Sequence, residues 1–253
     1  QMIVGPLTRE EVNAVLEQSG ALPMILLNRG AKAPTAGSAS FALLPEDEGA
    51  DAANRLADRG LKQVLVVSSR TDAAQRSVTA FADALKKRGG AIVGDVPVSG
   101  EIPDLSQQFS GFKSAAAPPQ AVFLALDAGQ ARTIVTQLKL SSLGALPRIA
   151  TAQILTGANA KSDLELDGIE YPELPWLLGQ AGGLPEAGAL AKSLPGARGG
   201  GQRLFAFGFD AWKLAAYFER LYNDPSYSIP GVTGELQIAI SGSVRRSPSW
   251  AVF

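Results

Sequence analysis

The short motif in the sequence that could carry bond-breaking chemistry is Ser110-Gly-Phe-Lys113, which matches the S-x-x-K nucleophile motif of penicillin-recognising enzymes. Such a site needs no histidine, because the lysine activates the serine. The companion motifs S-D-N and K-T-G are absent. Phe109 and Phe112 explain the same segment as a short amphipathic helix with Ser110 and Lys113 around its outer side. We therefore interpret this segment as structural and predict no catalytic residue.

Two other patterns also have structural explanations. The glycines within 196–201 follow no strand and lack the Gly-Lys-Ser/Thr of a phosphate loop, so they predict a mobile connection. Glu46, Asp47 and Glu48 come directly after Pro45, which favours a helix start with three carboxylates at the positive end of the helix dipole over a calcium site. We expect no metal site and no cofactor.

Composition excludes further chemistry. The 253 residues include no histidine and no cysteine, which removes Ser-His-Asp and Cys-His catalysis, thiol redox work and zinc sites that need nitrogen or sulfur ligands. The net charge of −1 and the lack of a Lys/Arg-rich run argue against nucleic acid as a partner. Since no apolar stretch approaches the ~18 residues of a transmembrane helix, we expect no membrane span in this sequence.

The elements that would position any site are organised around residues 61–98. Val64 to Val67 form an unbroken apolar run, as in a parallel strand buried on both faces. Val78, Phe81 and Leu85 then recur with helical spacing, and a second strand follows at 92–98. This strand, helix and strand predict a right-handed parallel crossover. Residues 44–155 are expected to form one parallel α/β lobe with strands at 64–68, 92–98, 121–126 and 148–151.

The flanking regions predict a second, smaller set of elements. A strand starts abruptly at Ile3, as though earlier βα units were missing, so we expect fewer strands in the lobe containing it. Thr8 and Glu11 form a capping box for a helix that ends near Gly20. We also expect a strand at 23–27, an extended piece at 41–44, and long loops or crossings between lobes through 156–203. Further along, we expect a helix at 204–222, with Trp212 and Tyr217 filling core or interface, and a closing hairpin of 234–240 with 250–253.

Several of these pieces resemble a known family. The most specific are Gly5-Pro6-Leu7, the segment Leu44-Pro45-Glu46-Asp47-Glu48, the helix segment 206–212 with the pattern FGxDAW, and Ser249-Trp250. In order along the chain they resemble type I periplasmic binding proteins and, more narrowly, the C-terminal domain of the LpoA or LppC lipoprotein activators of penicillin-binding proteins. The helical-repeat domain and lipid-bearing cysteine expected upstream in that family are not in this sequence.

The resemblance implies a two-lobed α/β fold with parallel, doubly wound sheets and a truncated N-terminal lobe. The first, incomplete lobe is expected to comprise residues 1–43 and about 171–228, and the second 44–170 and about 229–253. It also implies a non-catalytic, periplasmic regulator attached to the outer membrane in the full-length protein, whose partner is a class A penicillin-binding protein. The alternative is a periplasmic module that binds an amino acid or peptide.

If a ligand does bind, its position follows from the sheet. Ligands of open parallel sheets lie beyond the carboxyl ends of the strands. The residues expected there, lining the cleft of a two-lobed fold, are Pro6, Leu7, Thr8, Asn28, Ser68, Ser69, Arg70, Asp127 and Thr151. Pro6 offers no amide and Leu7 no hydroxyl, so we expect a weakened anion site in the first lobe, while Arg70 and Asp127 could take a carboxylate and an ammonium group.

Overall fold

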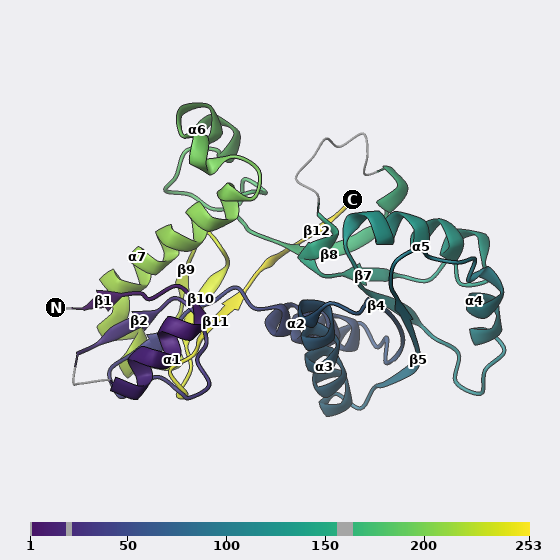
Figure 1. Ribbon diagram of the computed structural model, residues 1–253, viewed down its shortest axis with the longest axis horizontal. Coiled ribbons are helices and arrows are strands. Elements are labelled where there is room, and N and C mark those ends of the chain that lie inside the picture. The colour runs from purple at the N-terminus through teal and green to yellow at the C-terminus, as the bar shows by residue number, and fades with distance from the viewer. Residues whose placement is uncertain (1, 19–21, 156–163) are drawn as a thin grey trace. The chain divides into compact units, whose positions relative to one another are not determined.

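The computed structural model of the chain describes residues 2–18, 22–155 and 164–253 (Figure 1). The chain forms two compact units. Unit 1 comprises Gln1–Leu43 and Glu173–Ser249, and unit 2 comprises Leu44–Pro172 and Trp250–Phe253. Both mix helices with β-sheet, and the six-stranded sheet of unit 2 is largely parallel, so the predicted α/β class is confirmed. The expected helix end near Gly20 lies outside the described residues.

Unit 2 is built on a six-stranded sheet with the order β12-β8-β7-β6-β4-β5. Its strands are β4 (Gln63–Ser69), β5 (Ala91–Val98), β6 (Ala121–Ala125), β7 (Arg148–Ala150), β8 (Ile169–Glu173) and β12 (Ser249–Val252). The pairs β5/β4, β4/β6, β6/β7 and β7/β8 are all parallel. The parallel lobe predicted for residues 44–155 is therefore confirmed.

Helices cover both faces of this sheet. They are α2 (Pro45–Asp58), α3 (Asp72–Lys87), α4 (Ser106–Phe112) and α5 (Ala128–Leu140). Val64 and Val66 point into a core shared with α2 and α3, and Leu65 and Val67 point into the opposite core with α4 and α5. Because successive residues of a strand face opposite sides of the sheet, a strand that is buried on both sides needs consecutive apolar residues, as in this run of four. Phe81 of α3 stacks on the sheet, with its ring centroid 4.2 Å from that of Phe123.

The α2 and α3 helices approach unusually closely at Gly49. A Cβ atom on this residue would lie 2.1 Å from the carbonyl oxygen of Ser77, far inside van der Waals contact. Nearby, Arg76 of α3 forms two hydrogen bonds of 2.9 Å with the carboxylate of Glu46 in the first turn of α2. The acidic residues after Pro45 therefore do start a helix, and one of them also ties that helix to its neighbour.

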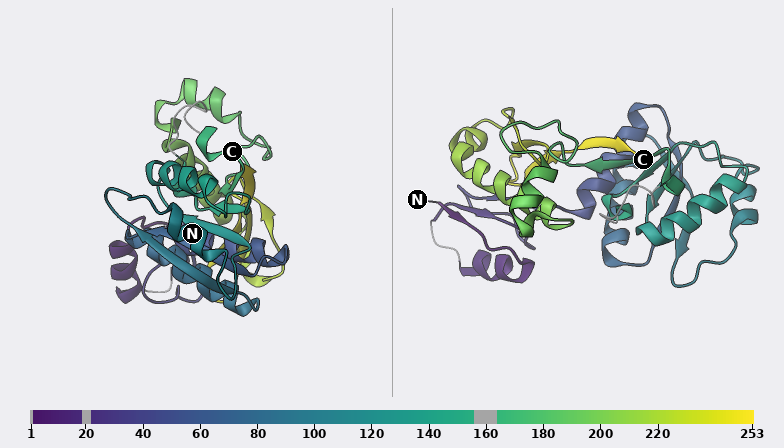
Figure 2. Two further views of the ribbon diagram at one scale, coloured as in Figure 1. Left: turned by 90° about the vertical axis from the view of Figure 1, so that its right-hand side faces the viewer. Right: turned by 90° about the horizontal axis from the view of Figure 1, so that it is seen from above.

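Unit 1 contains two three-stranded sheets. The parallel one consists of β1 (Ile3–Val4), β2 (Met24–Leu26) and β3 (Ala39–Ser40), and the antiparallel one of β9 (Ile229–Pro230), β10 (Glu235–Ile238) and β11 (Val244–Ser247). The helices α1 (Arg9–Gln18) and α7 (Gly201–Asn223) lie on opposite sides of the parallel strands (Figure 2). Met24 and Leu26 contact α1, and Ile25 joins the core beneath α7.

The end of the chain is arranged differently from the prediction. The segment 234–240 pairs with β11, not with 250–253, and residues 229–249 belong to unit 1 instead of the second lobe. The reason is burial, because Ile229, Leu236 and Ile238 complete the core under α7. Trp250 instead packs into the unit 2 core, 4.9 Å below the guanidinium of Arg55.

Three smaller expectations are also wrong. The extended piece expected at 41–44 is β3 at Ala39–Ser40. The stretch 156–203 was expected to hold long loops or crossings between lobes; the chain does pass from unit 2 to unit 1 between Pro172 and Glu173, but the described part also includes β8 and α6 (Ala187–Ser193), so the expectation of loops alone is wrong. Among the described residues, unit 1 has two sheets of three strands against one of six in unit 2, so the expected deficit of strands is wrong. The helix predicted at 204–222 is confirmed as α7.

The contact at Gly49 generates a stability prediction. Gly49→Ala should lower the free energy of unfolding of unit 2 by about 1–3 kcal/mol, because α2 and α3 must separate to admit the methyl group. The matched control is Gly111→Ala in α4, where an added Cβ meets no atom within 4 Å; it should leave stability unchanged or raise it by up to about 1 kcal/mol. Hydrogen exchange of the β4 and β6 amides measures both. Equal values for the two variants would contradict the prediction.

Candidate functional site

Five of the predicted site residues gather at one edge of the unit 2 sheet. The strands β4, β6 and β7 are parallel neighbours, so their carboxyl ends lie side by side. The residues at or directly after these ends are Ser68, Ser69, Arg70, Asp127 and Thr151. The topology thus brings them to one edge, as their positions in the sequence predicted. Whether a ligand binds them stays a prediction.

Most of these polar groups are already hydrogen-bonded within unit 2. The hydroxyl of Ser69 lies 3.0 Å from that of Thr71, the N-cap of α3. The side-chain amide of Gln75 donates to the Ser69 carbonyl at 2.7 Å. Asp127 accepts a hydrogen bond of 2.9 Å from the Gln130 amide and caps α5. These side chains therefore start the helices that cover the sheet, and their capacity for a ligand is reduced.

A carboxylate of the protein itself occupies the end of β7. Glu48, from the first turn of α2, accepts a hydrogen bond of 2.8 Å from the Ala152 amide. That amide opens a short 3-10 helix directly after Thr151 and is the kind of donor that would bind a ligand's carboxylate. The Thr151 hydroxyl oxygen and the Gln130 side-chain oxygen are buried without a hydrogen-bond partner among the described residues. These two atoms are the unsatisfied polar groups near this edge.

The other four predicted residues lie in unit 1. The side-chain amide of Asn28 donates to the Leu7 carbonyl at 3.0 Å, and the Leu27 amide donates to the Pro6 carbonyl at 3.0 Å. The Thr8 hydroxyl donates to the Glu11 carboxylate at 2.7 Å and accepts from the Glu11 amide, which confirms the capping box. Because these four residues and the other five belong to different units, their meeting in one cleft stays a prediction.

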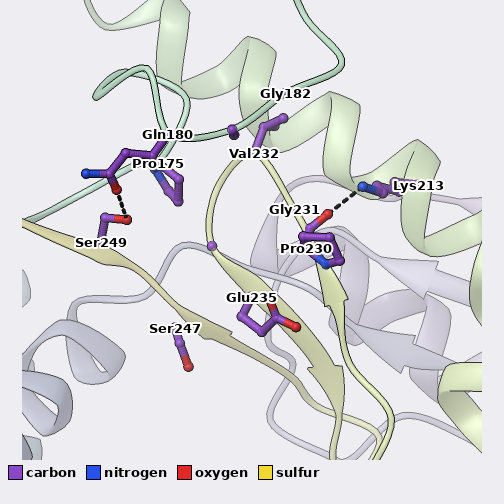
Figure 3. Close-up of a pocket in the computed structure, with 12 residues that line it drawn as sticks. Pro175, Gln180, Gly182, Lys213, Pro230, Gly231, Val232, Glu235, Ser247 and Ser249 are labelled. Atoms are coloured by element: carbon purple, nitrogen blue, oxygen red, sulfur yellow. Dashed lines mark hydrogen bonds between the residues drawn. The ribbon is translucent and has the colours of Figure 1, made fainter.

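A pocket that the sequence did not reveal lies entirely within unit 1 (Figure 3). Its volume is about 520 Å³, within the range of small-molecule sites. It lies between the loop after β8, the β9–β10 turn and the end of β11. The lining residues are Pro175, Gln180, Ala181, Gly182, Lys213, Pro230, Gly231, Val232, Gly234, Glu235, Ser247 and Ser249. They come from four distant stretches, so spacing along the sequence could not have predicted the pocket.

The visible polar contacts of this pocket are internal. Lys213 of α7 donates to the Pro230 carbonyl, and the Ser249 hydroxyl donates to the side-chain oxygen of Gln180 at 2.7 Å (Figure 3). Glu235 accepts a hydrogen bond of 2.6 Å from the Ser228 hydroxyl. Lys213 and Glu235 nevertheless place opposite charges along the lining, so a small ligand carrying both charges would suit the pocket better than an apolar one.

The wall of the pocket is held from behind by Asp210. This fully buried residue of α7 accepts hydrogen bonds from the Val232 amide at 2.9 Å, the Thr233 amide at 2.7 Å and the Thr233 hydroxyl at 2.5 Å. Burial raises the pKa of the Asp210 carboxyl above its ordinary value, and the three hydrogen bonds oppose that shift. A Cβ at Gly231 would lie 2.6 Å from the Asp210 carboxylate, so only glycine fits beside it.

A second buried carboxylate, that of Glu173, supports the same region. Glu173 forms an ion pair of 2.7 Å with Arg203 of α7 and accepts a hydrogen bond of 2.7 Å from the Leu174 amide. Burial raises the pKa of the Glu173 carboxyl, although the charge of Arg203 works against it. Arg246 donates to the Thr233 carbonyl at 3.0 Å. Together with Asp210, these groups fix the β9–β10 turn and the start of the loop after β8 onto α7.

Comparison with known proteins identifies the family. The sequence matches the family described as LppC putative lipoprotein over residues 1–253. The chain belongs to the LppC family. It is 28% identical to the penicillin-binding protein activator LpoA of Klebsiella pneumoniae, over 98% of this chain and 40% of the relative. The LpoA of Mannheimia succiniciproducens is also 28% identical, over 98% and 43%. The chain thus spans about two fifths of the length of these curated relatives.

Solved structures show the same fold. The LpoA (YraM) C-domain from Haemophilus influenzae, a regulator of PBP1A, superposes with a TM-score of 0.82 at 23% identity, covering 100% of this chain and 79% of that chain. A putative branched-chain amino acid ABC transporter protein from Chromobacterium violaceum gives a TM-score of 0.76 at 23% identity, with 100% and 80% covered. The predicted type I periplasmic-binding-protein-like fold is therefore confirmed.

The structure gives a physical role to the FGxDAW pattern of this LppC chain. Its Asp210 is the buried acceptor behind the β9–β10 turn, and Phe207 packs on Phe41 of the β-sheet layer with ring centroids 4.5 Å apart. Trp212 is different, because 64% of its surface is exposed, and Tyr217 is 46% exposed. The expectation that these two rings fill the core is wrong, whereas an interface role stays a prediction.

The weaker sequence signals are structural. In α4, Phe109 is buried and Phe112 packs beside it, while Ser110 and Lys113 are exposed. Of the glycines within 196–201, Gly196 lies in a 3-10 helix, Gly199 and Gly200 form a turn, and Gly201 starts α7, where a Cβ would be 2.0 Å from the Gly196 carbonyl oxygen. Residues 2–18, 22–155 and 164–253 contain no cluster of three acidic side chains placed to hold a metal. No described helix is long and apolar enough to cross a membrane.

The Asp210 interactions generate the second prediction. Asp210→Asn should lower the free energy of unfolding of unit 1 by about 1–3 kcal/mol, because the new amide group faces a backbone N–H and leaves it unsatisfied. Asp224→Asn is the matched control, since exposed Asp224 accepts similar bonds from the Ser226 amide and hydroxyl; it should change stability little. Hydrogen exchange of the β10 amides reports both values. A loss no larger at Asp210 than at Asp224 would refute the role assigned to the buried carboxylate.

Proposed function

We propose that this chain is part of a non-catalytic regulator of peptidoglycan synthesis that activates a class A penicillin-binding protein by protein–protein contact. The observation that carries the proposal is the match of 98% of this chain to relatives named penicillin-binding protein activator LpoA. The structural match to a C-domain described as a regulator of PBP1A is consistent with it. The family description as a lipoprotein supports a periplasmic location, attached to the outer membrane through a lipid anchor upstream of this chain.

Two features of the chain support the non-catalytic part. The sequence has no histidine and no cysteine, which removes the commonest general bases and the thiol nucleophile. Ser110 and Lys113, the pair that could act without histidine, are exposed at the end of a seven-residue helix whose Phe109 is buried. Exposed side chains do not have the water-excluded surroundings in which a preorganised site stabilises developing charge most strongly.

Activation without catalysis needs only a difference in affinity. If the regulator binds the active conformation of the synthase more tightly than the inactive one, the active population rises by that ratio. A coupling of ~1–3 kcal/mol corresponds to a five- to 150-fold change. Broad, solvated surfaces on two compact units are sufficient for such contact, and no bond chemistry in the regulator is required.

A reconstituted synthase assay tests this function. The full-length protein is added to its cognate class A penicillin-binding protein together with lipid-linked precursor. It should raise the rate of peptide cross-linking about five- to 150-fold, the range that corresponds to this coupling. The full-length protein alone should neither cleave muropeptides nor hydrolyse penicillin. An unchanged cross-linking rate at saturating protein, or turnover of either substrate by the protein alone, would each count against the proposal.

The second candidate function is binding of an amino acid or short peptide. It is favoured by the buried hydroxyl of Thr151 at the unit 2 edge, which has no hydrogen-bond partner among the described residues, and by the unit 1 pocket with Lys213 and Glu235. Against it, Glu48 already occupies the amide after β7. A ligand carboxylate at that amide would have to displace the carboxylate of Glu48.

Calorimetry separates this candidate from the first. Titration with free amino acids and short cell-wall peptides should give no dissociation constant in the micromolar range or tighter, which corresponds to about −8 kcal/mol. Tight binding would overturn this ranking, and two variants would then locate it. Loss of binding in Arg70→Ala would assign the ligand to the unit 2 edge, and loss in Lys213→Ala would assign it to the unit 1 pocket. Lys87→Ala, at an exposed position of α3, is the control that should change nothing.

A further inference from the structure

The pocket in unit 1 brings two opposite charges close together without pairing them. Lys213 of α7 donates to the Pro230 carbonyl of β9, and Pro230 is the cross-strand partner of Glu235 in β10 (Figure 3). Directly opposite residues of antiparallel strands have Cβ atoms about 4.5–5.5 Å apart, so both charges lie at the same part of the lining. In the described part of the chain, Lys213 and Glu235 form no ion pair with each other. Both charges are therefore available to a third group.

Each charged group keeps hydrogen-bonding capacity for a ligand. The Lys213 ammonium group has several donors, and the structure shows one of them on the Pro230 carbonyl. The Glu235 carboxylate can accept up to about four hydrogen bonds, and it receives one of 2.6 Å from the Ser228 hydroxyl. A ligand carboxylate can bind at Lys213 and a ligand ammonium group at Glu235 while both existing bonds remain. A zwitterion satisfies both charges at once, whereas a singly charged ligand satisfies one.

The walls of the pocket are formed before any ligand enters. The β9–β10 turn is closed by a hydrogen bond of 2.9 Å from the Gly231 amide to the Gly234 carbonyl. A Cβ at Gly234 would lie 2.4 Å from the Ser247 carbonyl oxygen, so the backbone of this wall carries no side chain there. Gly182 also lines the pocket, but an added Cβ on it would meet no atom within 4 Å. The pocket is thus rigid at the turn and has open space beside Gly182.

Two segments that lead into unit 2 line the same pocket. Gln180 lies in the loop after β8, and Ser249 is the last residue of unit 1 before Trp250. The Ser249 hydroxyl donates to the Gln180 side chain at 2.7 Å. The Trp176 amide of the same loop donates to the Val232 carbonyl of the turn at 3.3 Å. A ligand held between these segments binds the closed arrangement and therefore opposes their separation.

We infer that the unit 1 pocket is a low-affinity regulatory site for zwitterionic amino acids and short peptides, with the carboxylate at Lys213 and the ammonium group at Glu235, and that its occupation stabilises the two segments that lead into unit 2. Lys213 is half-buried and Glu235 is exposed, so both ion pairs are screened by water, and we expect a dissociation constant of about 1–10 mM. The inference takes its ligand class from the second candidate function, but the binding accompanies activation instead of replacing it.

Hydrogen exchange of the full-length protein tests this site. The probe is dialanine at about 20 mM, which should slow exchange of the Trp176, Gln180 and Gly231 amides about three- to 20-fold, as mass action gives for a dissociation constant of about 1–10 mM. Dialanine amide, which lacks the carboxylate, and N-acetyldialanine, which lacks the ammonium group, are the ligand controls. Each should slow exchange less than about twofold, because one charge of the pocket stays uncompensated.

Four variants locate the ligand. Lys213→Gln and Glu235→Gln each remove one charge and keep a hydrogen-bonding group, and Gly182→Leu fills the open space. All three should reduce the protection by dialanine to less than about twofold. Gly188→Leu in α6 is the matched control, because an added Cβ there also meets no atom within 4 Å and the residue does not line the pocket. Lys213→Gln should leave the weak protection by dialanine amide unchanged, whereas a purely structural effect would lower it as well.

Each outcome decides the inference. Protection that needs both ligand charges, is lost in the three pocket variants and persists in Gly188→Leu supports it. Absence of protection in the unsubstituted protein would overturn it. Equal protection by the singly charged ligands, or protection that survives all three pocket variants, would overturn it as well. Since no synthase is present, a protein that activates its partner without showing this protection would keep the proposed function and lose only this inference.

Discussion

Burial of β4 on both faces is the constraint on which unit 2 depends. Val64 and Val66 are fully buried against α2 and α3, and Leu65 and Val67 are fully buried on the opposite side. Each such side chain contributes roughly 1.5–3 kcal/mol when removed from water. A strand with two buried faces requires helices on both, and the parallel crossovers then place every helix start at the carboxyl edge of the sheet. The location of the polar residues at that edge follows from this arrangement.

The carboxyl edge of the unit 2 sheet is used largely by the protein's own side chains. In this chain its polar groups cap α3 and α5, and Glu48 supplies a carboxylate where a ligand's would otherwise bind. These hydrogen bonds stabilise the loops while using up the donors that recognition of an amino acid needs. Apart from the Thr151 hydroxyl and the Gln130 side-chain oxygen, which have no hydrogen-bond partner among the described residues, this edge therefore offers a small ligand few free polar groups.

Unit 1 depends on a different kind of interaction. Its two small sheets share one core beneath α7, and the buried carboxylate of Asp210 joins the β9–β10 turn to that helix. The ion pair between Glu173 and Arg203 lies where the chain passes from unit 2 into unit 1. An alternative arrangement that left these buried charges unpaired would be strongly destabilised. Unit 1 is therefore held together by its apolar core beneath α7 and by these buried polar contacts.

The sequence by itself determined the elements whose signals are local. The continuous run at Val64–Val67, the helical spacing through Phe81 and the capping box of Thr8 each specify a conformation within a few residues, and parallel pairing follows because the crossover is long enough. Only the tertiary structure decided where the last strands belong. Residues 234–240 and 250–253 are both short and apolar, and their partners depend on which core has room for Leu236 and which for Trp250. The tertiary structure also decided the hydrogen-bond partners of Asp210, which are more than twenty residues away, and the exposure of Trp212. Spacing predicts which residues share a face of a helix, but it does not predict what packs against that face.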